Sequence, residues 1–548
     1  MAVSGIRIAS FWTPFALTAA AIGGCAEESP PLSPVYNPIE SGAGRENETS
    51  ETGENPCAQW EDGSDQEADD QGGFKFDVGE DNSLFNLPAS CDEVAGTQTN
   101  LGCEFWAVDL PNEWRGSGKS PPAAEQQFAV VVANASSLEP ADVKIYLGAS
   151  AEVLVSASVA VNETHEFQLD PQSISPDRNS DDGVAFRVVS DLPITAYQFN
   201  PLDNEIEVYS NDASLLLPTH ALGTSYAAVT GDGVMLAIDS NDTEAVSAGA
   251  FLSIVANEDD TEISVLPTTS VLPGPLSAIK LDRGAVFTVL SDGSVPGNNL
   301  SGTRVISDKP VAAFSGNVAT IVPVSAQQCC ADHLEHQLIP HDAWGTAYTV
   351  APAASPAFGS DPTVFRLTGA FETTDLYYCP QRPYGAPTRI GATESAVFES
   401  FLPFTVHSGA AKQPFGLTEF LESNRAIKPE NGQLGDPAMI VLPPTAQFQH
   451  KYLFAVPRGY ALNHLTIVGP GGQWMLDGVR VPAVDRQDLG MLEGRMFYFA
   501  RLKIDAGSHT VEASVPVGVT VTGMDEAVSY GFPGGVGLHV IAAVPPEG

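Results

Sequence analysis

Basic residues are scarce in this chain of 548 residues. It carries 25 Lys and Arg against 68 Asp and Glu, which gives a formal net charge of -43. Such a charge repels nucleic-acid phosphates, so nucleic-acid binding is excluded. Charged residues make up only 17% of the chain, too few for long exposed helices, whereas 50 Gly and 42 Pro supply many turns. This balance predicts strands joined by turns, in a chain long enough for several domains.

Long apolar runs are also scarce. The stretch from Ile8 to Ile22 stands alone, and no later segment approaches the ~18 consecutive apolar residues of a membrane span. Arg7 precedes this stretch, which is typical of a secretion signal, here predicted over residues 1–24.

A short motif ends the predicted signal. The sequence Ile22-Gly23-Gly24-Cys25 resembles the bacterial lipobox, and the resemblance implies that Cys25 becomes the lipidated first residue of the mature chain. The alternative is an ordinary secretory peptide with a chance cysteine. Ala26, rather than Asp, follows the cysteine, and under the common sorting rule this implies an outer-membrane lipoprotein on either face of that membrane.

An acidic, proline-rich segment follows over residues 25–80. It includes Pro30-Pro31 and the run from Glu61 to Asp70, and it has too few apolar residues to fold. Self-repulsion extends such a segment, so we expect a tether that holds the following domains away from the membrane.

The chain has only seven cysteines. Without Cys25 an even number remains, which in an exported protein predicts up to three disulfides among Cys57, Cys91, Cys103, Cys329, Cys330 and Cys379. Cys91 and Cys103 form the favoured pair, because they close a short loop that would contribute roughly 3 kcal/mol. Cys329 and Cys330 are adjacent and would take separate partners, one of which could be Cys379.

Internal repeats give the strongest architectural signal. A Leu-Pro or Ile-Pro motif and a tyrosine-containing strand recur three times, each time followed by alternating strands that read as a hairpin, such as Phe251–Asn257 with Thr261–Val265. Ser-Asp-x-Pro, at Ser190–Pro193 and Ser307–Pro310, reads as a turn whose Asp binds local amides and whose Pro sets the angle of a return strand.

The repeats predict an all-β fold of tandem β-sandwich-like modules, with a closed β-propeller as the alternative. The expected modules follow the signal (1–24) and tether (25–80) and span residues 81–212, 213–335, 336–438 and 439–548.

Eight motifs between about residue 90 and residue 540 occur in a characteristic order: Cys91–Val94, Thr99–Asp109, Tyr197–Pro201, Ser210–Pro218, Ser307–Val311, Asp332–Glu335, Gly435–Met439 and Val528–Gly531. Together they resemble the IgGFc-binding protein N-terminal domain family. The resemblance implies an extracellular binding or adhesion module and carries over no catalytic residues. Members of that family often have a cysteine near Ala319, which is absent here and leaves the partner of Cys329 or Cys330 open.

Candidate ligand-binding side chains are few. His333, His336 and His341 follow Cys329-Cys330 and could ligate zinc, but their spacing fits no zinc-protease pattern, so a disulfide-braced loop is preferred. The loops Asp177–Asp182 and Asp239–Glu244 could bind calcium, although neither matches a calcium-loop motif, and no other cofactor is expected. Trp106, Trp114, Trp344 and Trp474 could stack on sugars or be buried.

These observations predict a non-catalytic, lipid-anchored surface protein that binds an extracellular protein or glycan. No Gly-x-Ser-x-Gly motif indicates a hydrolase. An envelope-anchored glycan hydrolase and a purely structural envelope protein are the alternatives.

Overall fold

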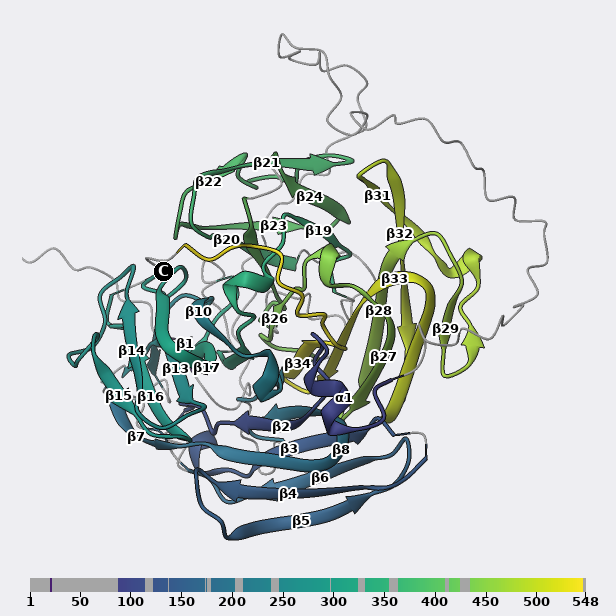
Figure 1. The fold of residues 1–548 in the computed structure, drawn as a ribbon. Helices are drawn as coiled ribbons and strands as arrows, with labels where there is room; N and C mark the ends of the chain where they lie inside the picture. Colours follow the sequence, from purple (N-terminus) through teal and green to yellow (C-terminus); the bar gives the residue numbers. More distant parts are fainter. Residues whose placement is uncertain are drawn as a thin grey trace, which may run out of the picture.

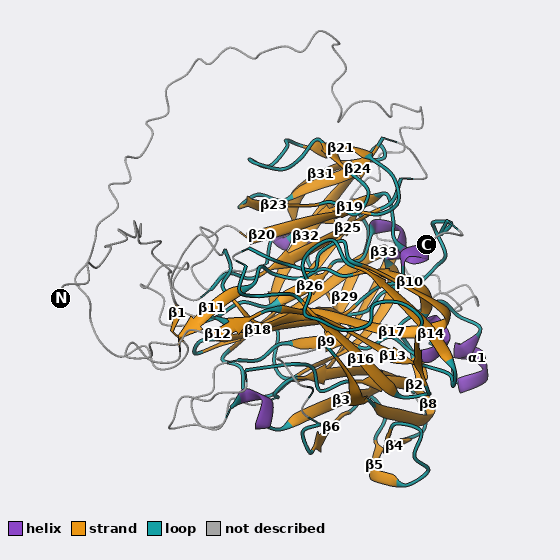
Figure 2. Cartoon of the chain, turned by 90° about the vertical axis from the view of Figure 1, so that its left-hand side faces the viewer, coloured by secondary structure: helices purple, strands orange, loops and turns teal. Residues whose placement is uncertain are grey.

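In the described part of the chain, β-strands are the main secondary structure and α-helix is limited to one short segment (Figure 2). A computed structural model describes residues 20–21, 87–113, 122–136, 138–172, 174, 179–202, 210–237, 246–295, 297–323, 331–353, 363–409, 413–423 and 434–545. Helix α1 (Cys91–Ala95) is capped by Ser90, whose side chain accepts a hydrogen bond from the Glu93 N–H. Within the described ranges no helix is long and apolar enough to cross a membrane.

Most strands fall into four groups that share one topology (Figure 1). In the first, second and fourth groups one long strand bends midway, so that its first half pairs into one sheet and its second half into another; two shorter strands take these places in the third group. The first strand of the group joins the first half, and the last strand joins the second half. The two sheets pack face to face over a common apolar core, as in a β-sandwich.

The first group contains β2 (Gly102–Ala107), β3 (Phe128–Asn134), β4 (Ala141–Leu147), β5 (Val153–Val159), β6 (Thr164–Leu169), the long strand β8 (Phe186–Phe199) and β9 (Ala213–Leu215). The second contains β10 (Gly223–Ala227), β13 (Ala250–Ala256), β14 (Thr261–Leu266), β15 (Ile279–Leu281), β16 (Ala285–Leu290), the long strand β17 (Arg304–Thr320) and β18 (Asp332–Gln337).

The third group contains β19 (Ala347–Val350), β20 (Thr363–Gly369), β21 (Thr374–Cys379), β22 (Arg389–Ile390), β23 (Ser395–Ser400), β24 (Phe404–Ser408), β25 (Phe415–Phe420) and β26 (Met439–Val441). Here β24 and β25 stand in place of one continuous long strand. The fourth contains β27 (Gln449–Val456), β28 (Leu462–Pro470), β29 (Trp474–Leu476), β30 (Val479–Arg480), β31 (Gln487–Leu492), β32 (Arg495–Lys503), the long strand β33 (Gly507–Asp525) and β34 (Val528–Pro533).

The remaining elements are short. Strand β7 (Ser180–Val184) extends the second group by pairing with β16, and β1 (Ala20–Ala21), β11 (Val234–Ala237) and β12 (Val246–Ala248) form a small sheet. Single-turn 3₁₀ helices are η2 (Ala123–Glu125), η3 (Thr219–Ala221), η5 (His341–Ala343), η7 (Thr445–Gln447) and η8 (Ala483–Asp485). Three of them, η3, η5 and η7, each connect the last strand of one group to the first strand of the next.

The predicted hairpins are wrong, although their strands are present. β13 and β14 do not pair with each other: β13 pairs with β16 and β17, whereas β14 pairs with β15 and β17. The chain therefore crosses from one sheet of the sandwich to the other between them. The alternating pattern identified the buried face of each strand. The shared pairing partner, however, is the long strand β17, which belongs to both sheets.

The Ser-Asp-x-Pro motif is also not a turn before a return strand. It lies inside the single strands β8 and β17, at the point where each leaves one sheet for the other. Pro193 and Pro310 lack the N–H that a continuous ladder would need there. Asp191 accepts a hydrogen bond from the backbone N–H of Asp142 at 2.7 Å, on the adjacent strand β4 rather than locally.

A tyrosine in the first strand of three groups holds this bend. The hydroxyls of Tyr226, Tyr348 and Tyr452 donate to the backbone carbonyls of Val311, Phe415 and Val517, which lie just after the bend. Burial raises the pKa of all three tyrosines, with the hydroxyl kept as a donor. The tyrosines that recur in the sequence thus have a shared structural role. 

The four groups close into a ring (Figure 1). Their last strands, β9, β18, β26 and β34, lie at the centre, each next to its neighbours around the axis. Backbone hydrogen bonds also join the segment before β2 to the segment after β34, from Asn100 N to Val536 O at 3.1 Å and from Leu538 N to Gln98 O at 3.0 Å. The all-β prediction with sandwich-like modules is confirmed, whereas the cyclic closure of these modules was not expected from the sandwich reading.

Candidate functional site

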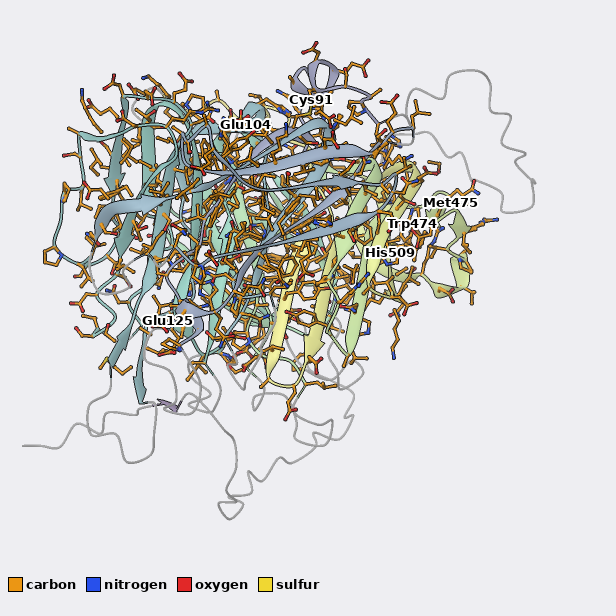
Figure 3. All side chains as sticks on the ribbon, turned by 90° about the horizontal axis from the view of Figure 1, so that it is seen from below. Cys91, Glu104, Glu125, Trp474, Met475 and His509 are labelled. Atoms are coloured by element: carbon orange, nitrogen blue, oxygen red, sulfur yellow. A yellow bond between two sulfur atoms is a disulfide. The ribbon has the colours of Figure 1, made fainter. Side chains whose placement is uncertain are left out.

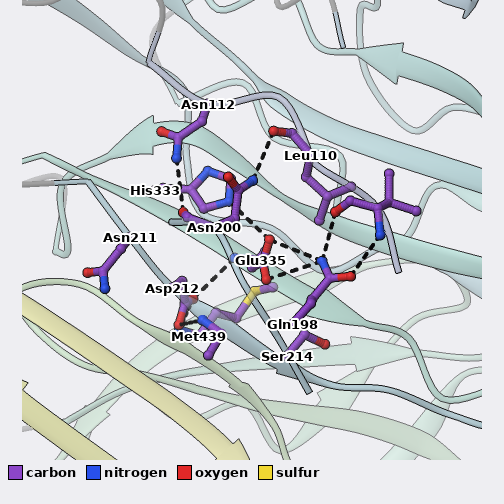
Figure 4. Close-up of polar contacts among 12 residues, drawn as sticks. Leu110, Asn112, Gln198, Asn200, Asn211, Asp212, Ser214, His333, Glu335 and Met439 are labelled. Carbon is purple, nitrogen blue, oxygen red and sulfur yellow. Dashed lines mark hydrogen bonds and ion pairs between the residues drawn. The ribbon is translucent and has the colours of Figure 1, made fainter. Parts of the chain in front are cut away.

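A buried carboxylate lies where the four groups meet (Figure 4). Asp212 precedes β9 and accepts backbone hydrogen bonds from Ala213 at 2.8 Å, Glu335 at 3.1 Å and Met439 at 3.0 Å. The backbone N–H of Gly531 binds it as well. These donors belong to β9, β18, β26 and β34, and each stands two residues before the end of its strand. One side chain therefore binds all four groups.

Asp212 and its four N–H donors form what we call the hub, and other carboxyl groups surround it. Burial raises the pKa of Asp212 well above its ordinary value, while the four N–H donors oppose that rise. Burial also raises the pKa of Asp332, as do the nearby carboxyls of Asp436 and Asp212. The pKa of Glu335 is raised by burial and by Asp212, and its oxygens accept hydrogen bonds from the Gln198 amide at 3.2 and 3.3 Å. This network is enclosed by protein, which suits a structural role.

The three histidines considered for zinc have separate partners. His333 Nε2 lies 3.4 Å from Glu335, and burial lowers the pKa of His333 to about 3, so this contact is a neutral hydrogen bond. His336 Nδ1 lies 2.7 Å from the carbonyl of Gln337, and His341 Nδ1 lies 2.8 Å from Ser225 Oγ. Across the described ranges, no three Cys, His, Asp or Glu side chains converge as metal ligands do.

The structure contains a disulfide between Cys91 and Cys103, the pair that the sequence favoured. This disulfide joins α1 to β2. Figure 3 shows Cys91, on α1, and Glu125 on opposite faces of the ring. Cys379 is also disulfide-bonded. The predicted partners Cys329 and Cys330, together with Cys57 and the lipidation candidate Cys25, lie outside the described residues.

The tryptophans in the described ranges are buried. Trp106 donates to Asn257 Oδ1 at 2.9 Å, Trp344 donates to the carbonyl of Ile339 at 3.0 Å, and the Arg486 guanidinium stacks on Trp474. None of these three therefore offers a face for sugar stacking, and Trp114 lies outside the described part.

One candidate calcium loop is partly visible. Asn179 donates to the carbonyl of Leu272 at 2.6 Å and accepts from the N–H of Leu290 at 2.8 Å, so its side chain holds the loop against the second group. Asp177, and all of Asp239–Glu244, fall outside the described residues.

The third group carries an open groove. The groove has a volume of about 500 Å³ and lies between the segments 380–385 and 397–404. Its floor is formed by Phe398 and Phe404, which also belong to the apolar core of this group. Its rim exposes Tyr384 by 96%, Phe401 by 58% and Leu402 by 56%. Large apolar side chains gathered at a groove are characteristic of an interaction site.

Two hydrogen-bonded turns, one on each side, form the rim of the groove. Ser400 Oγ donates to the carbonyl of Leu402 at 2.8 Å and accepts from the N–H of Leu402 at 3.2 Å. On the other side, the N–H of Ala386 donates to the carbonyl of Pro383, and Gly385 has a φ of +78°, which favours glycine. The rim residues are thus presented on fixed turns.

The groove and the hub were both missed by sequence reasoning. The hub residues Asp212, Glu335 and Met439 stand in the motifs Ser210–Pro218, Asp332–Glu335 and Gly435–Met439, which recur at the ends of the repeats and could have indicated a shared centre. The groove has a weaker signal in the apolar run Phe401-Leu402-Pro403-Phe404, which breaks the alternation of β23.

Two comparisons with known proteins place the sequence of this chain. A family model described as IgGFc binding protein matches residues 212–523, which is more than half of the chain. The human (Homo sapiens) IgGFc-binding protein is 25% identical to it over 378 residues, which cover 65% of this chain and 6% of the human protein. The chain thus spans only a small part of that relative. On the family match, this chain belongs to the IgGFc-binding protein family.

Proposed function

We propose that this chain is a non-catalytic binding protein whose ligand, an extracellular protein or glycan, occupies the groove between the segments 380–385 and 397–404. The observation that carries the proposal is the exposed apolar rim of Tyr384, Phe401 and Leu402 above a floor of core phenylalanines. Aromatic side chains held on rigid turns supply large contact area with little loss of conformational freedom. The name of the human relative supports a protein ligand.

The chemistry of the groove favours binding over catalysis. Glu399 is its one carboxylate, and its lining contains no histidine. Glycoside hydrolysis needs two carboxyl groups across the scissile bond, and nucleophilic hydrolysis needs a base beside the nucleophile. Arg382 and Glu399 instead give the apolar groove one charge of each sign for orienting a ligand.

Substitution of the rim tests this proposal. The full chain is applied to arrays of extracellular proteins and glycans, and the double variant Tyr384→Ala/Phe401→Ser is compared with it. We expect the variant to bind the selected ligand at least about tenfold more weakly, since rim aromatics dominate such contacts. Titration by calorimetry measures the change in Kd.

A matched control separates the groove from general surface stickiness. Val484 is 87% exposed, lies on η8 of the fourth group and does not line the groove, so Val484→Ser should leave Kd within about twofold. Equal losses in both variants, or release of cleaved products from the arrayed glycans, would contradict a groove-centred, non-catalytic function.

We also propose that the chain is a bacterial outer-membrane lipoprotein exposed at the cell surface. The support is the lipobox resemblance at Ile22–Cys25 and the acidic segment that follows it. Cells fed an alkyne-labelled fatty acid should label the wild type and not the Cys25→Ser variant, and protease added to intact cells should remove the labelled protein's folded part. Labelling that persists in Cys25→Ser, or full protection from protease, would refute the anchor or the surface exposure respectively.

A further inference from the structure

One edge strand departs from the pattern of the four groups. In each group, the sheet that also contains the first strand of the group ends at an outer edge strand. These four edge strands are β5, β15, β22 and β30. Strands β15, β22 and β30 contain two or three residues and include Lys280, Arg389 and Arg480 respectively. Short length and basic side chains are common means of preventing an edge from accepting another strand. These three edges are therefore protected.

Strand β5 has neither protection. It contains seven residues, Val-Leu-Val-Ser-Ala-Ser-Val, without a charge, proline or glycine. In the described part of the chain it pairs only with β4. Leu154 is 51% exposed and Val153 is 42% exposed, while Val155 and Ala157 are half-buried against the core of the first group. The outer side of β5 thus offers a long backbone edge beside a partly open core.

The charges around β5 indicate what kind of segment fits. Glu152 precedes the strand, and Glu163 follows it, so both ends are acidic. Near the middle, Lys144 on β4 stands opposite Ser156. A partner strand with an uncharged centre and basic ends would complement this arrangement. The net charge of -43 on each chain opposes pairing with a second copy.

We propose that β5 binds an extended polypeptide segment, basic at both ends and uncharged in its centre, as an eighth strand of the first group. Backbone hydrogen bonds along β5 supply the affinity, and the acidic ends set the preference for basic flanks. This surface belongs to a different group from the groove, so the inference stands independently of the proposed ligand site.

The test uses the full chain and a labelled synthetic peptide, Lys-Lys-Thr-Val-Thr-Val-Thr-Lys-Lys, measured by fluorescence anisotropy. Ala157→Lys places a charge on the half-buried face of β5, and we expect it to weaken binding at least about tenfold. Val479→Lys adds the same charge at an exposed position on β30, the corresponding edge of the fourth group, and should change Kd by less than about twofold. Thermal melts verify that both variants fold.

Hydrogen exchange distinguishes the addition of a strand to β5 from simple charge attraction. Peptide binding should slow amide exchange within Val153–Val159 and leave β15 and β22 unaffected. Equal weakening by both variants, protection outside β5, or dimers in sedimentation that Ala157→Lys dissociates would each overturn the proposal, the last by assigning the edge to a second copy. If Ala157→Lys fails to fold, Ser156→Lys on the exposed face of β5 provides the same comparison.

Discussion

Replacing Asp212 with asparagine is expected to lower the free energy of unfolding by about 3–5 kcal/mol, because it breaks the hub that binds all four strand groups. The carboxylate accepts from Ala213, Glu335, Met439 and Gly531. An asparagine has one oxygen, and its NH₂ group would face two of these N–H donors. Two buried donors then lose their acceptor, and each such loss costs about 1–3 kcal/mol.

Chemical denaturation followed by circular dichroism measures this change. Asp191→Asn is the matched control, since that carboxylate also accepts a backbone hydrogen bond, from Asp142 at 2.7 Å, but is exposed to water. We expect the control to lose no more than about 1 kcal/mol, because water replaces the lost partner. Similar losses for the two variants would show that Asp212 is an ordinary cap rather than the centre of the ring.

The second large effect concerns pH. Glu419 on β25 is buried, and burial raises its pKa from the ordinary 4.5 to about 7, although the N–H of Ala353 at 2.6 Å and the charge of Arg501 oppose the rise. The folded chain therefore holds a proton that the unfolded chain releases. Stability from the protonated form is complete below about pH 4.5 and is lost as pH rises through 7, by roughly 3 kcal/mol.

Glu419→Gln should remove this part of the pH dependence. Glutamine keeps an oxygen for the Ala353 N–H and does not titrate. Between about pH 5 and about pH 8.5 the wild type should lose roughly 3 kcal/mol more than the variant, as measured by denaturant unfolding at each pH. Glu166→Gln, at an exposed position on β6, is the control for removing one carboxyl group, and its stability at fixed pH should change by less than about 1 kcal/mol. Parallel curves for wild type and Glu419→Gln would rule out the assignment.

Local sequence patterns predicted individual strands well. Alternation in Thr261–Val265 corresponds to β14, and the run Phe251–Asn257 corresponds to β13, a strand buried along its whole length. The same patterns predicted the wrong partners, because alternation reports which face of a strand is buried and carries no information on which strand lies beside it. The nearest strand in sequence was taken as the partner, whereas both strands pair with β17.

The disulfide between Cys91 and Cys103 illustrates a tertiary feature within reach of sequence, since a short loop constrains its own ends. The hub at Asp212 and the groove at Tyr384 and Phe401 were out of reach. The hub takes its residues from all four groups, and the groove takes its rim from turns whose exposure depends on the packing of two sheets.

The sequence by itself determined the all-β class, the repeated strands and the high net negative charge, because composition and residue periodicity act locally or as sums. Only the tertiary structure decided that the long strands serve two sheets, that the four groups close into a ring, and that Asp212 lies at its centre. The physical reason is that a buried carboxylate becomes a hub only when N–H donors from distant strands converge on it, and that convergence is set by packing.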